Sequence, residues 1–242
     1  MGGALFILLC ALLPTVQSVR VMTWNLWNER FSATSWEGRV GAVLREVRKQ
    51  RPAVLAVQEC TAGMLEMMDL DDSLPYETPF SPSDPARTGE GLVIFSSVPI
   101  ETSWLERLPD GRNDRNQRMV LWADIDGVLY GNVHLSYDSA DATNQLLALL
   151  DRAPPTASVL MGDFNVYASD QDQFHRMVES RGWSSIWNGP TWSAVSGLRN
   201  PADHILVRSD TVNVIASQTS SRRGTLYAAA SDHLAVIGDV DP

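Results

Sequence analysis

The sequence predicts a single α/β domain, and three observations lead to this class. Short, nearly continuous apolar runs, as expected for strands covered on both faces, recur along the 242 residues. Segments with apolar residues at helical spacing lie between these runs. No internal repeat or low-complexity linker separates the two kinds of segment, so strands and helices are expected to share one fold.

The composition agrees with this class and excludes several others. Hydrophobic residues make up 44% of the chain, charged residues 20%, and only two cysteines occur. A disordered chain, a collagen-like chain and a disulfide scaffold are therefore excluded. The formal net charge of −10 argues against a module that covers a phosphate backbone with positive charge.

The first segment, residues 1–18, is predicted to be an export signal. Its ten-residue apolar run, Ala4–Leu13, is too short to span roughly 30 Å of hydrocarbon but suits a secretory signal. Val16 and Ser18 resemble the positions that a signal peptidase reads, although no Lys or Arg precedes Arg20. We expect cleavage and secretion or other export, to the periplasm or the extracellular space. An uncleaved anchor or a buried strand is the alternative.

Residues 19–242 are predicted to form one domain that is monomeric and has no stable membrane span. Removal of the signal would remove Cys10 and leave Cys60 as the one thiol, so no internal disulfide could form. We interpret Cys60 as an apolar residue at a strand end, because no histidine stands beside it in the sequence to activate a nucleophile.

Apolar runs and helical spacing predict the elements of this domain in order. The predicted strands are Val19–Asn25, Ala53–Gln58, Leu92–Ser96, Met119–Ile125, Leu129–Leu135, Ser158–Met161, Ile205–Val207 and Leu234–Ile237. One helix is predicted behind a Ser35 cap, and a second over Ala140–Ala153. A third begins at the capping-box-like Ser169–Asp172. The Pro/Ser-rich stretch Pro79–Pro85 is predicted to be a surface loop.

Polar side chains suited to chemistry lie near the ends of six apolar runs. The motifs are Thr-Trp-Asn25, Gln-Glu59, Asn-Val-His134, Gly-Asp-Phe-Asn165, Asp203-His-Ile-Leu and Ser-Asp-His233. Each alone is a weak signal, since such residues also cap turns or lie in a core. Strand ends converge in layered α/β folds, so the ordered set predicts one polar cluster.

This ordered set resembles the endonuclease/exonuclease/phosphatase superfamily, the deoxyribonuclease I-like group. That group includes apurinic endonucleases, tyrosyl-DNA phosphodiesterases, neutral sphingomyelinases and inositol-phosphate phosphatases. The resemblance extends from about Val21 to Val236 and is most specific at Gly-Asp-Phe-Asn165 and Ser-Asp-His233. It implies a four-layer α/β/β/α sandwich of two packed mixed sheets flanked by helices. It also implies metal-dependent hydrolysis of a phosphoester.

The resemblance implies that Glu59 is the main ligand of a divalent cation, with Asn25 beside it and Asp232 helping this site or a second ion. The chemistry calls for such a set, because a phosphodiester repels hydroxide and a cation offsets the developing charge. Mg²⁺ prefers oxygen ligands and keeps several waters, so one or two carboxylates suffice. We therefore expect Mg²⁺, with Mn²⁺ as a substitute.

The resemblance assigns catalytic roles to five further residues. His233 would take a proton from water and would be oriented by Asp203, while Asp163 would help to position that water. A histidine beside a carboxylate supplies a base that works near neutral pH. Asn165 would hold the phosphate, and His134 would bind one of its oxygens.

A local basic loop carries Arg112, Arg115 and Arg118. Arg118 falls near a position that contacts phosphate in several relatives, so we expect it to bind substrate, with plain solvation of the loop as the alternative. His204 follows Asp203 and is interpreted as structural. The acids of a metal site also make the global charge a weak guide to the substrate.

Three functions stay open at this point. We favour a nuclease-type enzyme acting on DNA or RNA, because of the local arginines and the compact length. A sphingomyelinase or inositol-phosphate phosphatase is the alternative. A lipid enzyme would need an exposed apolar surface, and we interpret Trp183, Trp187 and Trp192 as core residues instead. A non-catalytic binding protein is the third reading, and the retained acids and His233 argue against it.

Overall fold

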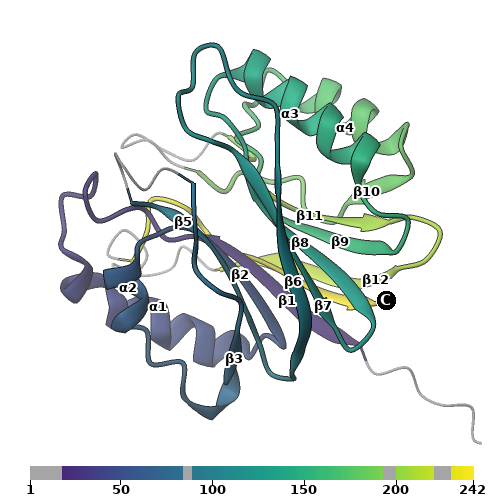
Figure 1. Ribbon diagram of the computed structural model, residues 1–242. Coiled ribbons are helices and arrows are strands. Elements are labelled where there is room, and N and C mark those ends of the chain that lie inside the picture. The colour runs from purple at the N-terminus through teal and green to yellow at the C-terminus, as the bar shows by residue number, and fades with distance from the viewer. Residues whose placement is uncertain (1–17, 84–88, 193–199, 221–229) are drawn as a thin grey trace, which may run out of the picture.

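The computed structural model describes residues 18–83, 89–192, 200–220 and 230–242. Within these ranges two β-sheets pack face to face, and helices cover their outer faces (Figure 1). The helices are α1 (Trp36–Gln50), α2 (Ala62–Glu66), α3 (Ser139–Arg152) and α4 (Gln171–Glu179), with a 3₁₀ turn at Asp71–Ser73. One sheet carries α1 and α2 and the other carries α3 and α4, which confirms the predicted four-layer α/β/β/α sandwich.

The first sheet, sheet A, has seven strands in the order β12-β13-β1-β2-β5-β3, and β4 also pairs with β5. Its strands are β1 (Val19–Asn25), β2 (Val54–Cys60), β3 (Tyr76–Glu77), β4 (Ser81–Pro82), β5 (Gly91–Ser96), β12 (Asn213–Thr219) and β13 (Val236–Asp241). The pair β1–β2 is parallel, whereas β13 runs antiparallel to β1. The carboxyl ends of β1 and β2 therefore meet the amino end of β13 at one edge.

The second sheet, sheet B, has six strands in the order β10-β11-β9-β8-β7-β6. Its strands are β6 (Ile100–Arg107), β7 (Met119–Ile125), β8 (Val128–His134), β9 (Ala157–Asp163), β10 (Trp183–Ser185) and β11 (Asp203–Arg208). Here β8 and β9 are parallel and β11 is antiparallel to β9. The ends of β8 and β9 thus lie beside the start of β11.

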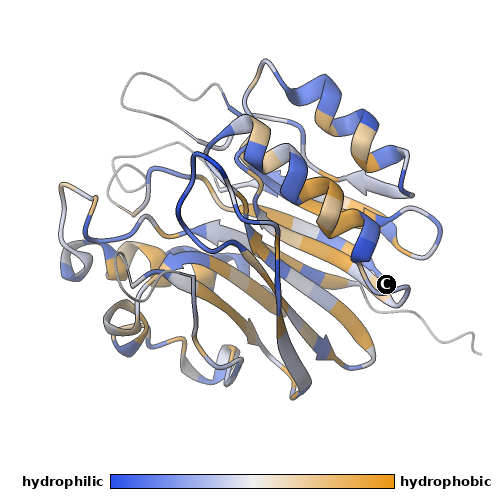
Figure 2. Ribbon diagram, turned by 45° about the horizontal axis from the view of Figure 1, so that its top comes forward, coloured by the Kyte–Doolittle hydropathy of each residue, from blue (hydrophilic) through white to orange (hydrophobic). Residues whose placement is uncertain are grey.

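Three apolar layers hold the sandwich together. One lies between sheet A and its helices, one between sheet B and its helices, and the third between the two sheets. Figure 2 shows apolar residues concentrated on the strands, and helices that carry both apolar and polar residues. Strands covered on both faces need apolar side chains at almost every position, which is why β2, β5 and β7 read as continuous apolar runs.

The predicted strands are all present, and β1 and β7 match the prediction at both ends. Two long strands were not predicted, β6 and β12. Both lie at sheet edges and most of their residues are exposed, so neither shows an apolar run. The last strand begins at Val236 and not at Leu234, and β4 lies within the stretch that was predicted to be a loop only.

The third helix begins within the predicted stretch Ser169–Asp172, but without the predicted capping box. Its N-cap is Asp170 and not Ser169, and the helix begins at Gln171. Asp170 accepts a hydrogen bond from Ser139 at 2.8 Å and makes no side-chain cap bond, so contact with α3 replaces the capping box.

The predicted export signal lies outside the described residues except for Ser18. No helix in the described ranges is long and apolar enough to cross a membrane.

Candidate active site

Sheet B aligns three predicted site residues in one row. In the parallel pair β8–β9, His134 lies opposite Asp163, and in the antiparallel pair β9–β11, Asp163 lies opposite Asp203. His134 Nε2 is 3.6 Å from Asp163 Oδ2. The strand register therefore brings together residues from three separate motifs.

Gly162 is what allows this row to form. It has φ +150°, and a Cβ added there would overlap the backbone carbonyl of Val133 on the neighbouring strand. A side chain would push β9 away from β8 just before Asp163. The glycine of the Gly-Asp-Phe-Asn165 motif is thus explained by close strand packing.

Sheet A contributes Asn25 and Glu59. The β2–β5 pairing is irregular between Val57 and Cys60, and Glu59 in this bulge has φ +56°. Such a conformation is costly for a non-glycine residue and recurs at functional sites. It turns the Glu59 carboxylate toward sheet B, where Oε1 lies 3.9 Å from His134 Nε2.

Asn25 connects the two sheets. Its Nδ2 donates to Glu59 Oε1 and to Asp163 Oδ2, both at 2.9 Å. Its Oδ1 accepts from the backbone N–H of Trp27 at 2.9 Å. Asn25 therefore presents its amide nitrogen to the carboxylates, so in this arrangement it orients them, and its role as a metal ligand stays a prediction.

His233 and Asp203 form a buried pair. His233 Nδ1 donates to Asp203 Oδ2 at 2.7 Å. The opposite ring nitrogen, Nε2, lies 3.8 Å from Asp163 Oδ2 and 4.0 Å from Asp232 Oδ1. Burial disfavours the charged imidazolium, but the three carboxylates outweigh burial and raise the pKa of His233 to about 10.

Burial also shifts the neighbouring groups. It raises the pKa of Asp163 to about 7, and the charge of Asp203 adds to this rise. Burial likewise raises the pKa of Asp232. The pKa of His134 is lowered well below its usual value by burial and by the charges of Arg118 and His233, so His134 is neutral.

Asn165 and Arg118 complete the set of predicted residues. Asn165 has φ +51°, and its backbone N–H donates to Asp163 Oδ1 at 2.8 Å. Arg118 is 2% exposed and is held by Asp114, with both Nε and Nη2 at 2.8 Å from Asp114 Oδ2. The predicted basic loop thus places the Arg118–Asp114 ion pair in the cavity wall. Phosphate binding by Arg118 stays a prediction.

One cavity of about 420 Å³ unites these groups. Its walls include Glu59, Arg118, His134, Asp163, Asn165, Asp232 and His233. Asn25 and Asp203 lie directly behind, hydrogen-bonded to wall residues. The structure therefore brings together all of the predicted site residues.

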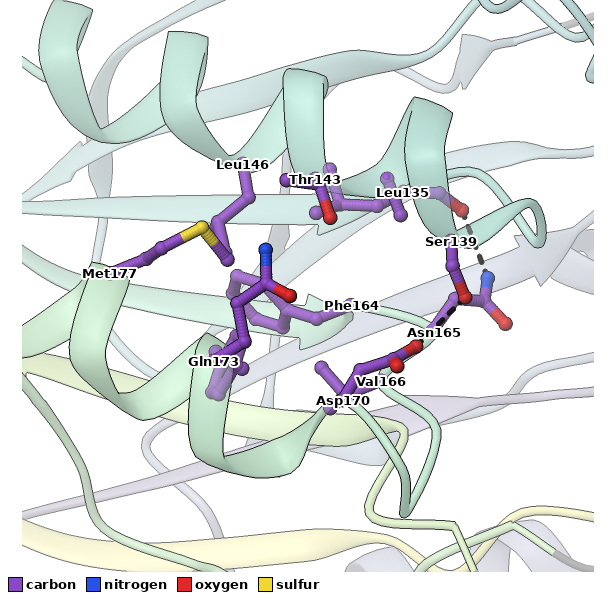
Figure 3. A pocket seen from close by; sticks show the side chains of 12 residues that line it. Leu135, Ser139, Thr143, Leu146, Phe164, Asn165, Val166, Asp170, Gln173 and Met177 are labelled. Atoms are coloured by element: carbon purple, nitrogen blue, oxygen red, sulfur yellow. Dashed lines mark hydrogen bonds between the residues drawn. The ribbon is translucent and has the colours of Figure 1, made fainter.

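A second cavity of about 30 Å³, between α3 and α4, is mostly apolar (Figure 3). Asn165 also borders it, but its amide donates to the carbonyl of Leu135.

The residues of the large cavity fit a divalent cation. Glu59, His134 and Asp163 offer ligand atoms within 4.8 Å of one another, and so do Asp163, Asp203 and His233. Among the described residues, buried Asp232 Oδ1 has no hydrogen-bond partner. Several carboxylate oxygens in one cavity repel one another unless a cation or protons offset their charge. Each group offers two carboxylates and one imidazole nitrogen as candidate ligands.

Sequence reasoning missed Glu90, Asp114 and most of the aromatic wall. Glu90 lines the cavity and is 4% exposed; burial first, and then Glu59, raise its pKa to about 7. Asn28 Nδ2 lies 3.3 Å from its Oε2. The available signal was an acid between two glycines immediately before an apolar run.

The interpretation of Trp192 as a core residue is wrong. This side chain lines the cavity and donates from Nε1 to Asp232 Oδ2 at 3.1 Å. Trp183 is fully buried, as predicted.

His204 is buried with Nε2 2.7 Å from the carbonyl of Pro201, which confirms a structural role. Cys60 is buried as well, and burial raises its pKa, so it is no nucleophile.

The fold and the site define the class of this protein as an α/β/β/α sandwich whose cavity gathers carboxylates and an aspartate–histidine pair. The model of the Endonuclease/Exonuclease/phosphatase family matches residues 22–233. The chain belongs to this family, whose members are phosphoester hydrolases. No curated protein matches the chain closely enough to count as a relative.

Solved structures share the fold at low sequence identity. A family protein from Bacteroides thetaiotaomicron is 19% identical, with a TM-score of 0.74 over 93% of this chain and 97% of that one. A mannosyl-6-phosphatase from Bacteroides thetaiotaomicron VPI-5482 is 19% identical, with a TM-score of 0.70 over 92% and 99%. D. rerio TDP2, complexed with single strand DNA product, is 14% identical, with a TM-score of 0.70 over 93% and 99%.

Proposed function

We propose that the protein is an exported, monomeric phosphodiesterase of nuclease type that requires Mg²⁺ or Mn²⁺. The observation that carries the proposal is the pairing of His233 with Asp203, which directs Nε2 toward Asp163 and Asp232 inside the cavity. Nε2 faces these carboxylates, so it is placed to take a proton from a water molecule, as a general base does. Export is supported by the apolar run near the amino terminus.

In the proposed reaction, a water molecule lies between His233 Nε2 and the Asp163 carboxylate. Its oxygen forms a bond to phosphorus while its proton moves to Nε2, and the bond from phosphorus to the leaving oxygen breaks. Asp203 accepts the hydrogen bond from Nδ1, fixes the ring and stabilises the imidazolium that forms. His134 and Asn165 donate to the nonbridging phosphate oxygens.

Glu59 and Asp232 would hold the cation, and Asn25 would orient Glu59. The bound cation would offset the negative charge that grows on the phosphate. Its charge among the carboxylates would also lower the pKa of His233 from about 10 toward neutrality, where a base works best. The acids of the cavity thus act as a metal site and do not argue against a phosphate substrate.

A nucleic acid is the substrate class we favour. Arg112 and Arg115 are exposed on the loop that carries Arg118, so positive charge lies beside the cavity. The likeness to TDP2 complexed with single strand DNA product points the same way. A sugar or inositol phosphate is the second candidate. It is favoured by the likeness to a mannosyl-6-phosphatase and by Asn116 and Glu90 in the cavity wall, which can bind hydroxyls.

The test is hydrolysis of bis-p-nitrophenyl phosphate by the purified protein. We expect turnover with Mg²⁺ or Mn²⁺ and none with EDTA. His233→Ala, Asp203→Asn and Glu59→Ala should each lower kcat about 10²-fold or more, as for loss of a general base or a major electrostatic stabiliser. His175→Ala, a histidine on α4 outside the cavity, is the matched control and should keep full activity. An unchanged rate in His233→Ala would overturn the assigned base.

The substrate class is settled by parallel assays on DNA, RNA, sphingomyelin, inositol phosphates and mannose 6-phosphate. Rapid cleavage of the nucleic acids supports the nuclease proposal. Rapid turnover of sphingomyelin or of a sugar phosphate, with DNA and RNA left intact, contradicts it while keeping the phosphoester hydrolase.

A further inference from the structure

We propose that the mouth of the active-site cavity binds unpaired nucleobases by aromatic stacking, so that the substrate is a single-stranded nucleic acid. This inference rests on the phosphodiesterase function proposed above. Its basis is an aromatic rim, which consists of the cavity-lining residues Trp27, Phe31, Tyr137, Tyr167 and Trp192.

The aromatic rim surrounds the carboxylates from both sheets. Trp27 and Phe31 lie on the loop that follows β1 in sheet A. Tyr137 follows β8 and Tyr167 follows β9, both in sheet B. A phosphate bound at the metal-ligating groups would thus have aromatic rings on either side. A strand that crosses the site places a base on each side of its scissile phosphate.

Two rings of the rim are open to solvent. Phe31 is 59% exposed and Tyr137 is 53% exposed, although both line the cavity. An exposed ring gains little from the core and keeps apolar surface in water. Base–aromatic stacking would cover that surface, and it tolerates any sequence because every base has a π-face.

Specific contacts hold three rings of the rim in place. Tyr137 Oη donates to the carbonyl of Asn113 at 3.1 Å, and Tyr167 Oη donates to the carbonyl of Tyr137 at 2.8 Å. Trp27 has φ +57°, and the Arg39 guanidinium lies 5.5 Å from its ring centroid. Rings that are fixed before a ligand arrives lose little entropy on binding. Trp27, Tyr137 and Tyr167 therefore form a preorganised part of the rim.

The charges of the cavity favour a single strand over a duplex. Among the described wall residues, Arg118 is the one arginine or lysine, and Asp114 is bound to it. Duplex binding relies on many such cations along the phosphate backbone. Stacking does not depend on charge, and both faces of a base inside a duplex are covered by its stacked neighbours. A lipid is disfavoured too, because Glu59, Glu90 and Asp232 lie in the same cavity.

The first experiment compares three substrates of equal length with the wild-type protein and Mg²⁺. They are a single strand, the same strand with every base replaced by an abasic site, and a duplex. We expect similar kcat for the two single strands, a KM about tenfold or more higher for the abasic strand, and poor cleavage of the duplex. Equal KM for the base-containing and abasic strands would overturn the inference.

Variants locate the effect on the rim. Tyr137→Ala and Phe31→Ala should each raise KM about tenfold for the base-containing strand and leave KM for the abasic strand unchanged. Tyr137→Phe keeps the ring but loses the hydrogen bond to Asn113, so KM for the base-containing strand should rise less than in Tyr137→Ala. Tyr76→Ala is the matched control, because Tyr76 is 41% exposed but lies on β3, outside the cavity wall. An equal rise of KM on both strands in Tyr137→Ala would contradict stacking.

Binding is measured separately from catalysis in the His233→Ala protein with Mg²⁺, by fluorescence anisotropy of a labelled strand. Tight binding of the single strand that Tyr137→Ala weakens about tenfold supports the rim. Binding to sphingomyelin vesicles that depends on Tyr137, with no affinity for the strand, overturns it. If the wild-type protein cleaves no phosphodiester at all, the proposed function fails, and this binding assay still decides the stacking inference.

Discussion

Gln58 Nε2 donates a hydrogen bond to Asn132 Oδ1 at 2.7 Å, across the interface between the two sheets. Asn132 in turn donates from Nδ2 to the carbonyls of Val57 and Val93 in sheet A, both at 2.9 Å. Gln58 immediately precedes Glu59, and Asn132 is two residues before His134. This buried network therefore sets the spacing between the candidate ligands of the two sheets.

The first prediction concerns this network. Asn132→Ala leaves two buried carbonyls without their donor, so we expect a loss of about 3 kcal/mol in the free energy of unfolding, measured by urea denaturation. Activity should fall as well, because Glu59 loses its alignment with His134. Asn213→Ala, at an exposed position of β12, should change neither. Wild-type stability in Asn132→Ala would show that the network does not hold the sheets.

The second prediction concerns Gly162. Gly162→Ala places a Cβ against the carbonyl of Val133, so β9 must shift away from β8. We expect a loss of about 2 kcal/mol or more in stability and a marked fall in kcat, because Asp163 moves with the strand. Gly63→Ala on α2 has open space around the added Cβ and should be neutral or slightly stabilising. Equal melting temperatures for the two variants would refute this role of Gly162.

The third prediction concerns Arg39, a fully buried residue of α1. Its guanidinium donates to the carbonyls of Leu26, Trp27 and Ala230 at 2.7–2.8 Å. Lysine has one nitrogen and cannot reach all three, so Arg39→Lys should lower stability by about 3 kcal/mol. Activity should fall too, since Ala230 leads into the Ser-Asp-His233 motif. Arg45→Lys, exposed on the same helix, is the control. Both quantities unchanged in Arg39→Lys would contradict the prediction.

The fourth prediction is a pH dependence of stability at Asp141. This carboxylate accepts the backbone N–H groups of Arg112, Asn113 and Asp114 at 2.9–3.2 Å, which lowers its pKa. Because the folded pKa lies below the unfolded value of about 3.9, the stabilisation is full above that value and is lost as the pH falls through the folded pKa.

Asp141→Asn should therefore lower the melting temperature at neutral pH, and the difference from wild type should shrink in acid. A thermal denaturation series from neutral to acidic pH checks this. Asp172→Asn, an exposed acid on α4, should show no such trend. A difference that stays constant across the series would mean that the charge of Asp141 does not hold the loop.

Local sequence was enough to find the buried strands and the motif residues. A strand that is covered on both faces must be apolar along its length, so β1 and β7 could be placed at both ends. The motifs near the strand ends indicate the site residues through their resemblance to a known family. The edge strands β6 and β12 could not be found in this way, because an exposed strand needs no apolar run.

The motifs of the sequence, through their resemblance to a known family, were enough to indicate that Glu59, Asp163, Asp203 and His233 form the site. How these residues are arranged depends on contacts that form only in the folded chain. The register of β9 places Asp163 beside His134, and the bulge at Glu59 turns its carboxylate across the sheets. The positions of Glu90 and of the aromatic rim in the cavity wall also follow only from the folded structure. These contacts join segments that are far apart in the chain, and they depend on strand register and sheet packing, which no local pattern encodes.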